Sequence, residues 1–304
     1  MKHLYASRIG CLVQFDHAPF KAIGVFKNGV DFVSAAGEMI YLTLSPQRGP
    51  YHLSVPSIDQ YIQLIEPGHS LYREDDIIQL PGLDIQILLK NALRWPKYAV
   101  PPICPWEKMK AAIQKTLKDS NDIEIPKNSI FRSINWGFDK TSTPSVNPLA
   151  ELSPESKVLA TRIPTLCCAL KHSDPENALK ESKSILGLGN GLTPSGDDIL
   201  AGILSVLYDL GNAGLKQTDW ISCFSTPLLS LSKTKTNLIS AALLSAAAQG
   251  EIDETLDDII FSLLNGNSPT QEMWQNLKTF GHTSGFDGLV GILLALLSLL
   301  PQSQ

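Results

Sequence analysis

A short pattern of serine, glycine and aspartate, followed by an apolar stretch, occurs twice in the chain and constrains its fold more than any other feature. Shifting the sequence by 89 residues aligns 193–204 with 282–293, and seven of these twelve aligned positions are identical. The identical pairs are Ser195/Ser284, Gly196/Gly285, Asp198/Asp287, Leu200/Leu289, Gly202/Gly291, Ile203/Ile292 and Leu204/Leu293. An internal match this dense predicts two similar loop–helix units, such as the duplication of a helical pair would leave.

A glycine-rich loop, Gly187-Leu188-Gly189-Asn190-Gly191, precedes the first copy. Glycine permits positive φ and a close approach of backbone to a ligand. The unpaired N–H groups and the dipole at a helix N-terminus favour an anion. The pattern therefore predicts a small anionic ligand between two helix N-termini. The residues expected to bind it are Gly187, Gly189, Asn190, Gly191, Thr193, Ser195, Gly196, Asp197, Thr283, Ser284 and Gly285.

Three further residues are candidates for catalysis. Asp198 and Asp287 each follow a motif serine by three residues, so each could complete a capping box or contact the ligand. His282 precedes the second serine and could act as a general acid or base, or equally as a helix cap. Gly202 and Gly291 follow the two aspartates by four residues and would let the two helices pack closely. If the helices cross there, both loops face one pocket.

Other interpretations of the motifs remain open. Serine, glycine and aspartate at a helix start are common capping chemistry, which would make the motifs structural. The glycine loop is not a phosphate-binding P-loop, because no lysine follows in the required place, and it does not keep the third glycine of a dinucleotide-binding fingerprint. Asp197 and Asp198 could hold a hydrated Mg²⁺ ion, the one cofactor that the sequence suggests. Lys233 and Lys235 could receive an anion or begin a solvated helix.

Composition limits the class of protein. The chain has 304 residues, 43% of them apolar, with 18% charged and a net charge of −5, so a sizeable core is expected and a basic nucleic-acid surface is not. Five cysteines without metal-site or disulfide spacing indicate reduced thiols. The N-terminus lacks the apolar core of a signal peptide. The longest apolar run, Leu289–Leu300, is too short for a bilayer and predicts a buried core helix. We therefore expect a cytoplasmic protein without membrane or nucleic-acid partners.

The predicted fold class is α+β, with a β-rich N-terminal domain, a small barrel or sandwich, over residues 1–100. A connector with one helix, from about Pro105 to Leu117, and a polar loop at Asn135–Asn147 occupies 101–150. An α-helical domain of seven or eight helices carries both motifs over 151–304. Asn28-Gly29 predicts a hairpin with positive φ at both residues. The expected strands are Ile9–Phe15, Lys21–Phe26, Val30–Val33, Met39–Leu44, Tyr51–Val55 and Tyr61–Ile65.

Helix starts in the second half carry a cap residue, proline and an acid, at Ser153-Pro154-Glu155 and Asp174-Pro175-Glu176. These two helices should run to about Lys171 and Leu186. Gly211, Gly250 and Gly266 stand where C-terminal glycines belong. The later helices are expected at Ile199–Leu210, Trp220–Leu231, Thr236–Ala248, Asp253–Leu264, Pro269–Phe280 and Ser284–Leu300.

Three motifs together resemble a known family. They are Gly-Leu-Gly-x-Gly-Leu-Thr-Pro-Ser-Gly-Asp-Asp at 187–198, Ala-Ala-x-Gly at 247–250 and Gly-His-Thr-Ser-Gly-x-Asp at 281–287. As a set they are similar to the AllH-type subunit of bacterial oxamate carbamoyltransferase, many of whose relatives are labelled only as a domain of unknown function. The similarity covers roughly residues 180–295. One departure is Thr236-Asn237, where the family usually has Thr-Thr or Ser-Thr.

The resemblance implies a multi-subunit enzyme of allantoin breakdown. That enzyme exchanges a carbamoyl group between oxalurate and phosphate, giving oxamate and carbamoyl phosphate. The implied partners are the other subunits and a small anionic substrate: carbamoyl phosphate, phosphate, oxamate or oxalurate. Such ligands suit an anion site, and a carbamoyl carbonyl needs donors for its oxyanion. A non-catalytic scaffold subunit and a Mg²⁺-dependent phosphotransferase are the alternatives.

Overall fold

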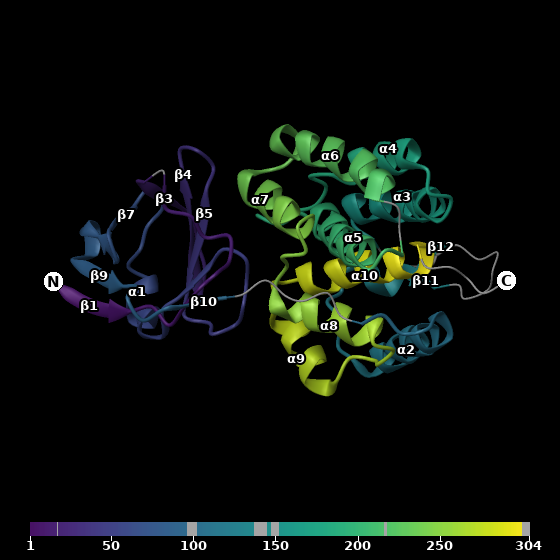
Figure 1. Cartoon of the computed structure of the whole chain (residues 1–304), viewed down its shortest axis with the longest axis horizontal. Coiled ribbons are helices and arrows are strands. Elements are labelled where there is room, and N and C mark those ends of the chain that lie inside the picture. Colours follow the sequence, from purple (N-terminus) through teal and green to yellow (C-terminus); the bar gives the residue numbers. More distant parts are fainter. Residues whose placement is uncertain (17, 96–101, 137–144, 147–151, 216–217, 300–304) are drawn as a thin grey trace. The chain divides into compact units, whose positions relative to one another are not determined.

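The chain forms two compact units, Met1–Tyr98 and Ala99–Gln304, in a computed structural model that describes residues 1–16, 18–95, 102–136, 145–146, 152–215 and 218–299 (Figure 1). The first unit is a β-sheet and the second is mainly helical, which confirms the predicted α+β class. The predicted boundary at residues 100 and 101 lies outside the described residues.

A single curled sheet makes up the first unit. Its strands lie in the order β1-β9-β8-β7-β3-β4-β5-β6-β2-β10. β1 pairs with β9, whereas β2, only two residues further along the chain, pairs with β6 and β10. The N-terminal segment therefore joins both ends of the sheet, and the curl encloses an apolar core. The strands are β1 (Lys2–Tyr5), β2 (Arg8–Ile9), β3 (Phe20–Val25), β4 (Gly29–Ser34), β5 (Met39–Thr43), β6 (His52–Ser54), β7 (Ser70–Glu74), β8 (Ile77–Leu80), β9 (Ile85–Leu88) and β10 (Leu93–Arg94).

Two of the predicted strands are wrong. Of Ile9–Phe15 only Ile9 belongs to a strand, because the chain turns directly after β2; Val13 and Phe15 are buried in the loop. The segment Tyr61–Ile65 is not extended either, since α1 (Asp59–Ile62) occupies its start after a 3-10 turn. The sequence carried the helical signal, because the buried side chains here are spaced four and three residues apart, at Ile58, Ile62 and Ile65.

The predicted hairpin exists between β3 and β4, but its turn differs from the prediction. The Phe26 N–H donates to the Gly29 carbonyl at 2.8 Å, so the two turn residues are Lys27 and Asn28. Neither Asn28 nor Gly29 has positive φ. Gly29 begins β4, and a Cβ there would lie 2.6 Å from the Tyr41 ring. Close packing against that ring explains the glycine.

Helices of the second unit follow the predicted ones closely. They are α2 (Trp106–Asp119), α3 (Pro154–Lys171), α4 (Pro175–Ile185), α5 (Ser195–Asn212), α6 (Thr218–Lys235), α7 (Leu238–Ala247), α8 (Glu254–Leu264), α9 (Gln271–Thr279) and α10 (Ser284–Leu299). α5 begins at Ser195 rather than at Ile199, which places its whole serine–aspartate motif inside the first turn. Most of the polar loop predicted at Asn135–Asn147 lies outside the described residues; β11 (Ile134–Asn135) and β12 (Ser145–Val146) pair across it.

Local capping chemistry fixes several of these boundaries. The Ser153 side chain accepts from the Ser156 N–H, and that of Asp174 from the Asn177 N–H, so both predicted N-caps are confirmed. Gly250 and Gly266 have positive φ just beyond α7 and α8, as predicted. Gly211 was wrongly expected to end its helix. It lies inside α5, and Gly214 takes the left-handed position instead.

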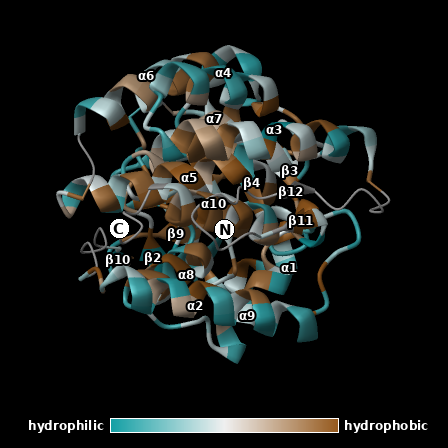
Figure 2. Cartoon of the chain, turned by 90° about the vertical axis from the view of Figure 1, so that its right-hand side faces the viewer, coloured by the Kyte–Doolittle hydropathy of each residue, from teal (hydrophilic) through white to brown (hydrophobic). Residues whose placement is uncertain are grey.

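The core of the helical unit is built around α5 and α10. Figure 1 shows these two helices in the middle, with α3, α4, α6 and α7 on one side and α2, α8 and α9 on the other. Both are strongly apolar where they run through the unit (Figure 2). Every side chain from Phe286 to Leu296 is buried, which confirms the predicted core helix. Nowhere in the described ranges is a helix long and apolar enough to cross a bilayer.

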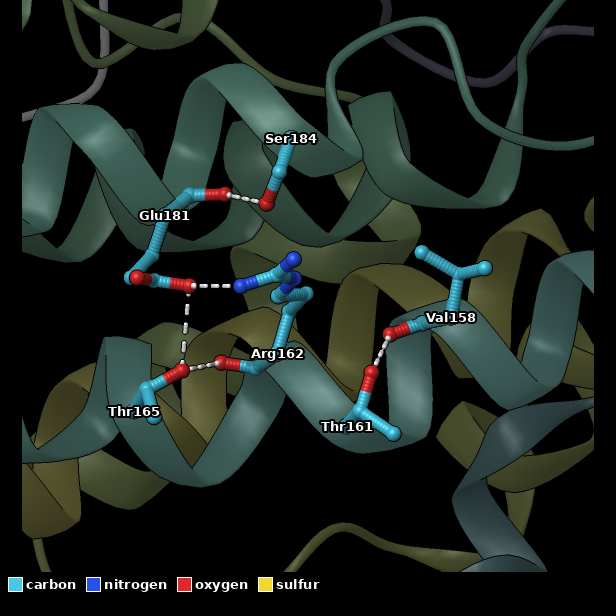
Figure 3. Close-up of polar contacts among 6 residues, drawn as sticks. All are labelled: Val158, Thr161, Arg162, Thr165, Glu181 and Ser184. Carbon is cyan, nitrogen blue, oxygen red and sulfur yellow. Dashed lines mark hydrogen bonds and ion pairs between the residues drawn. The ribbon is translucent and has the colours of Figure 1, made fainter.

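On the outside of this core, α3 and α4 are joined by a polar cluster (Figure 3). The buried Glu181 of α4 accepts from Arg162 Nη1 at 3.3 Å and from Thr165 Oγ1 at 3.1 Å, both on α3. Arg162 remains 45% exposed, so solvent screens much of this ion pair.

Candidate functional site

The two motif helices, α5 and α10, cross at their glycines. A Cβ on Gly202 would overlap the carbonyl oxygen of Gly288, and a Cβ on Gly291 would overlap that of Ile199. The 89-residue shift relates Gly202 to Gly291 and Ile199 to Gly288, so the two contacts are equivalent. The loop–helix units are therefore related by an approximate two-fold axis at this crossing. Because each glycine lies only about two turns from its helix N-terminus, the axis brings the two motifs together.

The hydroxyls of one motif reach the carboxyl of the other. Thr193 Oγ1 and Ser284 Oγ are 2.9 Å apart and join the two loops directly. The Ser284 hydroxyl also interacts with the Asp198 carboxyl, and its counterpart Ser195 interacts with Asp287. This exchange is the polar equivalent of the glycine contacts. It makes the two motifs a single site.

Asp287 is the most deeply buried acid of the site. Its side chain is 0% exposed, and its Oδ1 accepts from Ser129 Oγ at 3.2 Å. Burial raises the pKa of Asp287 to about 6, and the hydroxyls of Ser195, Thr283 and Ser129 limit that rise by hydrogen bonding to the charged form. An acid with such a pKa exchanges its proton near neutrality.

Asp198 faces the same region from α5. Burial, and then the nearby Asp287 carboxyl, raise the pKa of Asp198 well above its usual range, while the Ser284 hydroxyl opposes the shift. Within the described part of the chain, Oδ2 of both Asp198 and Asp287 is buried and has no hydrogen-bond partner. Buried acceptors are normally satisfied, so this pair of oxygens calls for a donor.

Asp197 has a different role from its neighbour. Its Oδ1 accepts from the Gly187 N–H at 2.7 Å, and its Oδ2 accepts from the Thr236 hydroxyl. The protein itself thus occupies the side chain that the sequence assigned to ligand binding. Burial raises the pKa of Asp197, against hydrogen bonds from Thr236, Gly187 and Ser240. The carboxyl fastens the start of the glycine loop to the junction of α6 and α7.

The adjacent acids Asp197 and Asp198 therefore engage different partners and do not form the Mg²⁺ pair suggested by the sequence. Successive residues of a helix point about 100° apart, which explains why one faces the loop and the other faces α10. In the residues that the structure describes, no group of three or more His, Cys, Asp or Glu side chains is placed to hold a metal ion.

Glycines of the loop have positive φ, as their spacing predicted: +75° at Gly187, +133° at Gly189 and +96° at Gly191. At Gly187 a side chain would also overlap the Lys235 carbonyl, so packing requires this glycine. Gly191 is exposed with open space around its α-carbon. The loop is anchored at Leu192, whose carbonyl accepts from Asn237 Nδ2 at 2.9 Å.

The predicted free N–H groups of the two Ser-Gly turns are not free. The Gly196 N–H donates to the Leu188 carbonyl at 2.9 Å, and the Gly285 N–H donates to the Phe280 carbonyl at 3.2 Å. Both glycines are buried, and a Cβ on either would collide with a backbone carbonyl, of Ile185 or of Leu277. The preceding segments fold back over the helix ends and use these donors. These two N–H groups are therefore not available to a ligand.

The remaining candidates lie at graded depths. Asn190, Gly191 and His282 are exposed; the four hydroxyl residues are half-buried; Asp287 and both Oδ2 atoms are innermost. The structure thus brings six of the candidates into one site and leaves His282 at its outer edge. The six are Thr193, Ser195, Asp198, Thr283, Ser284 and Asp287.

Sequence reasoning missed one side chain that contacts the candidate site. Ser129 precedes the 3-10 turn Ile130–Ser133 and reaches Asp287 across 158 residues of sequence. Its surroundings, Lys127-Asn128-Ser129-Ile130, carry no motif. Thr236 and Ser240, which support Asp197, lie in the stretch that the sequence marked for its lysines beside hydroxyls and for the family departure at Thr236-Asn237.

Comparison with known proteins confirms the resemblance drawn from the motifs. Residues 185–296 match the family described as "Oxamate carbamoyltransferase subunit AllH". The match runs from the last residue of α4 into α10 and so contains both loop–helix units. No solved structure matches the chain.

Proposed function

We propose, from the family match that contains both loop–helix units, that this chain is a subunit of an oxamate carbamoyltransferase-type enzyme and contributes the site between α5 and α10. The observation that carries the proposal is the reciprocal pairing of Ser195 with Asp287 and of Ser284 with Asp198. Capping alone would use each aspartate within its own helix, whereas this arrangement directs polar groups of both helices to one place.

The proposed reaction transfers a carbamoyl group from oxalurate to phosphate, giving oxamate and carbamoyl phosphate. All four are small anions, and the half-buried hydroxyls of Thr193, Ser195 and Ser284 offer them hydrogen-bond donors. Gly191 is exposed, and no other described part of the chain lies within 4 Å of where its Cβ would be. His282, which is also exposed, would add a further donor or exchange protons at the outer edge of the site.

The buried Asp287 and the half-buried Asp198, whose Oδ2 is buried, would orient the substrate and move protons. General acid–base groups work best when their pKa lies near the working pH. Burial gives this property to Asp287, whose pKa is raised to about 6. Asp198, beside it, would hold or release the proton that the amide nitrogen of the leaving oxamate requires.

Reconstitution of the enzyme with its partner subunits tests this proposal. We expect Asp198→Asn and His282→Ala to reduce phosphate-dependent oxalurate cleavage, by about 100-fold or more for Asp198→Asn. Asp209→Asn is the matched control, because Asp209 is the third acid of α5, near the far end of the helix, and burial raises its pKa to about 6. Unchanged turnover in Asp198→Asn, with the fold intact by circular dichroism, would refute the proposal.

A scaffold subunit is the second candidate. It is favoured by the internal use of the Gly196 and Gly285 N–H groups, which a dedicated anion site would leave available. In that case Asp198→Asn should weaken assembly of the complex, as measured by sedimentation, while the complexes that do form keep the wild-type kcat. A catalytic site predicts intact assembly and a lowered kcat.

A further inference from the structure

The deep end of the site offers acceptors without a donor. Oδ2 of Asp287 is completely buried and has no partner among the described residues, and Oδ2 of Asp198 shares this condition. Neither 187–204 nor 281–299 contains a lysine or an arginine that could neutralise them. Hydroxyls contact both acids: Ser195, Thr283 and Ser129 bond to Asp287, and Ser284 bonds to Asp198. A buried carboxyl pair with these neighbours is poorly suited to bind an anion directly.

The charge state of the pair follows from the same arrangement. Two neighbouring carboxyls with no lysine or arginine in either motif segment disfavour ionisation of both, so we take them to hold one proton between them. The nearby Asp287 carboxyl, which raises the pKa of Asp198 further than burial alone, agrees with this. One carboxyl then accepts hydrogen bonds, and the other donates one. Together they present a donor beside an acceptor.

We infer that Asp198 and Asp287 together bind the neutral carbamoyl end of the substrate, the CO–NH₂ group. This inference rests on the proposed function and names the part of the ligand that lies deepest in the site. The amide N–H donates to the ionised carboxylate, and the amide oxygen accepts from the protonated carboxyl. The carboxylate or phosphate end of the ligand then points outward, toward the hydroxyls of Thr193, Ser195 and Ser284.

The depth of the groups sets this orientation. A phosphate placed at the inner end would meet a carboxylate with no cation to offset the repulsion. At the outer end it meets half-buried hydroxyls and the exposed edge at Gly191 and His282. The reverse orientation would leave the buried Oδ2 atoms of both acids without a partner, which is unfavourable.

Oxamate and oxalate provide a direct test, because they have nearly the same size and differ in one group, NH₂ against O⁻. In titration calorimetry of the full chain at pH 7, we expect oxamate to bind about tenfold or more tightly than oxalate. Carbamoyl phosphate should likewise bind better than acetyl phosphate, which replaces the NH₂ with a methyl group. Asp287→Asn and Asp198→Asn should lose most of either preference, whereas Asp209→Asn should keep it.

Several results would overturn the inference: equal affinity for oxamate and oxalate, a preference for oxalate, no binding of either, or tight binding of Mg²⁺ alone that both asparagine variants abolish. The wild-type comparison stands even if a variant fails to fold. A different result would contradict the proposed function and leave this inference intact. If the chain prefers oxamate but the reconstituted complex transfers no carbamoyl group, only the assigned reaction is wrong.

Discussion

Replacing Gly291 by alanine should force α5 and α10 apart. The new Cβ would overlap the Ile199 carbonyl oxygen and lie 2.8 Å from its carbon and 3.1 Å from the Ile199 Cα. These are backbone atoms of a buried helix, so relief requires movement of a whole helix. Alanine gains about 1 kcal/mol over glycine in helix propensity. Overpacking a core lowers the free energy of unfolding by about 1–3 kcal/mol, and a collision with backbone atoms should lower it by about 3 kcal/mol or more. We expect a net loss of about 2 kcal/mol in the free energy of unfolding.

Gly211→Ala is the matched control on α5. Its Cβ would meet only the side-chain Cδ1 of Ile221, at 2.7 Å, and that methyl group can rotate away. Its stability should stay within about 1 kcal/mol of wild type. Urea denaturation, with the midpoint and slope fitted separately, measures both variants. Because the two-fold axis makes the two glycine contacts equivalent, Gly202→Ala should lower the free energy of unfolding as much as Gly291→Ala does. If Gly291→Ala proves as stable as Gly211→Ala, the glycine crossing does not hold the helices at closest approach.

Three further predictions concern charged side chains. The pKa of Asp287 is about 6 in the folded state and 3.8 ordinarily. Its protonated form therefore contributes about 3 kcal/mol to the free energy of unfolding below about pH 4, and this contribution is lost as pH rises through 6. In Asp287→Asn, that part of the decline in the free energy of unfolding between pH 4 and 7 should be absent. Asp197→Ala should lower stability by about 2–3 kcal/mol in urea denaturation, because it leaves the Gly187 N–H without its acceptor, whereas a loss below about 0.5 kcal/mol would show that the loop is held by other contacts. Arg162→Ala should lower it by less than about 1 kcal/mol, since the arginine is 45% exposed; a larger loss would mean that its ion pair with Glu181 is less screened than its exposure indicates.

Local patterns predicted much of the helical unit. Helical spacing of apolar residues and the caps at Ser153 and Asp174 placed most helices, because these signals act within a few residues. The internal repeat went further and predicted the crossing at Gly202 and Gly291, since two glycines at equivalent positions indicate close approach. Long-range pairing is less predictable. β1 went unrecognised because its partner β9 lies about 80 residues away and its own alternation is weak.

The site shows the same limit. The sequence identified both aspartates and the four motif hydroxyls, but it assigned Asp197 to ligand binding, whereas Asp197 bonds to Gly187 and Thr236 of the protein itself. Which of Asp197 and Asp198 faces α10 depends on the packing of helices 89 residues apart, and no local signal encodes it. The backbone donors were mispredicted for a related reason. Whether the Gly196 N–H is free depends on how the preceding loop folds back, and here the Leu188 carbonyl reaches it.

A double-mutant cycle on Asp198 and Asp287 tests the central claim, that these acids of two helices form one functional group. The measurement is kcat/KM for phosphate-dependent oxalurate cleavage in the reconstituted complex, for Asp198→Asn, Asp287→Asn and the double variant. Residues that act as a unit are strongly non-additive. The structure predicts that each single change lowers kcat/KM by about 100-fold and that the double change lowers it by little more. Independent, multiplicative losses, or no loss in either single variant, would contradict the claim.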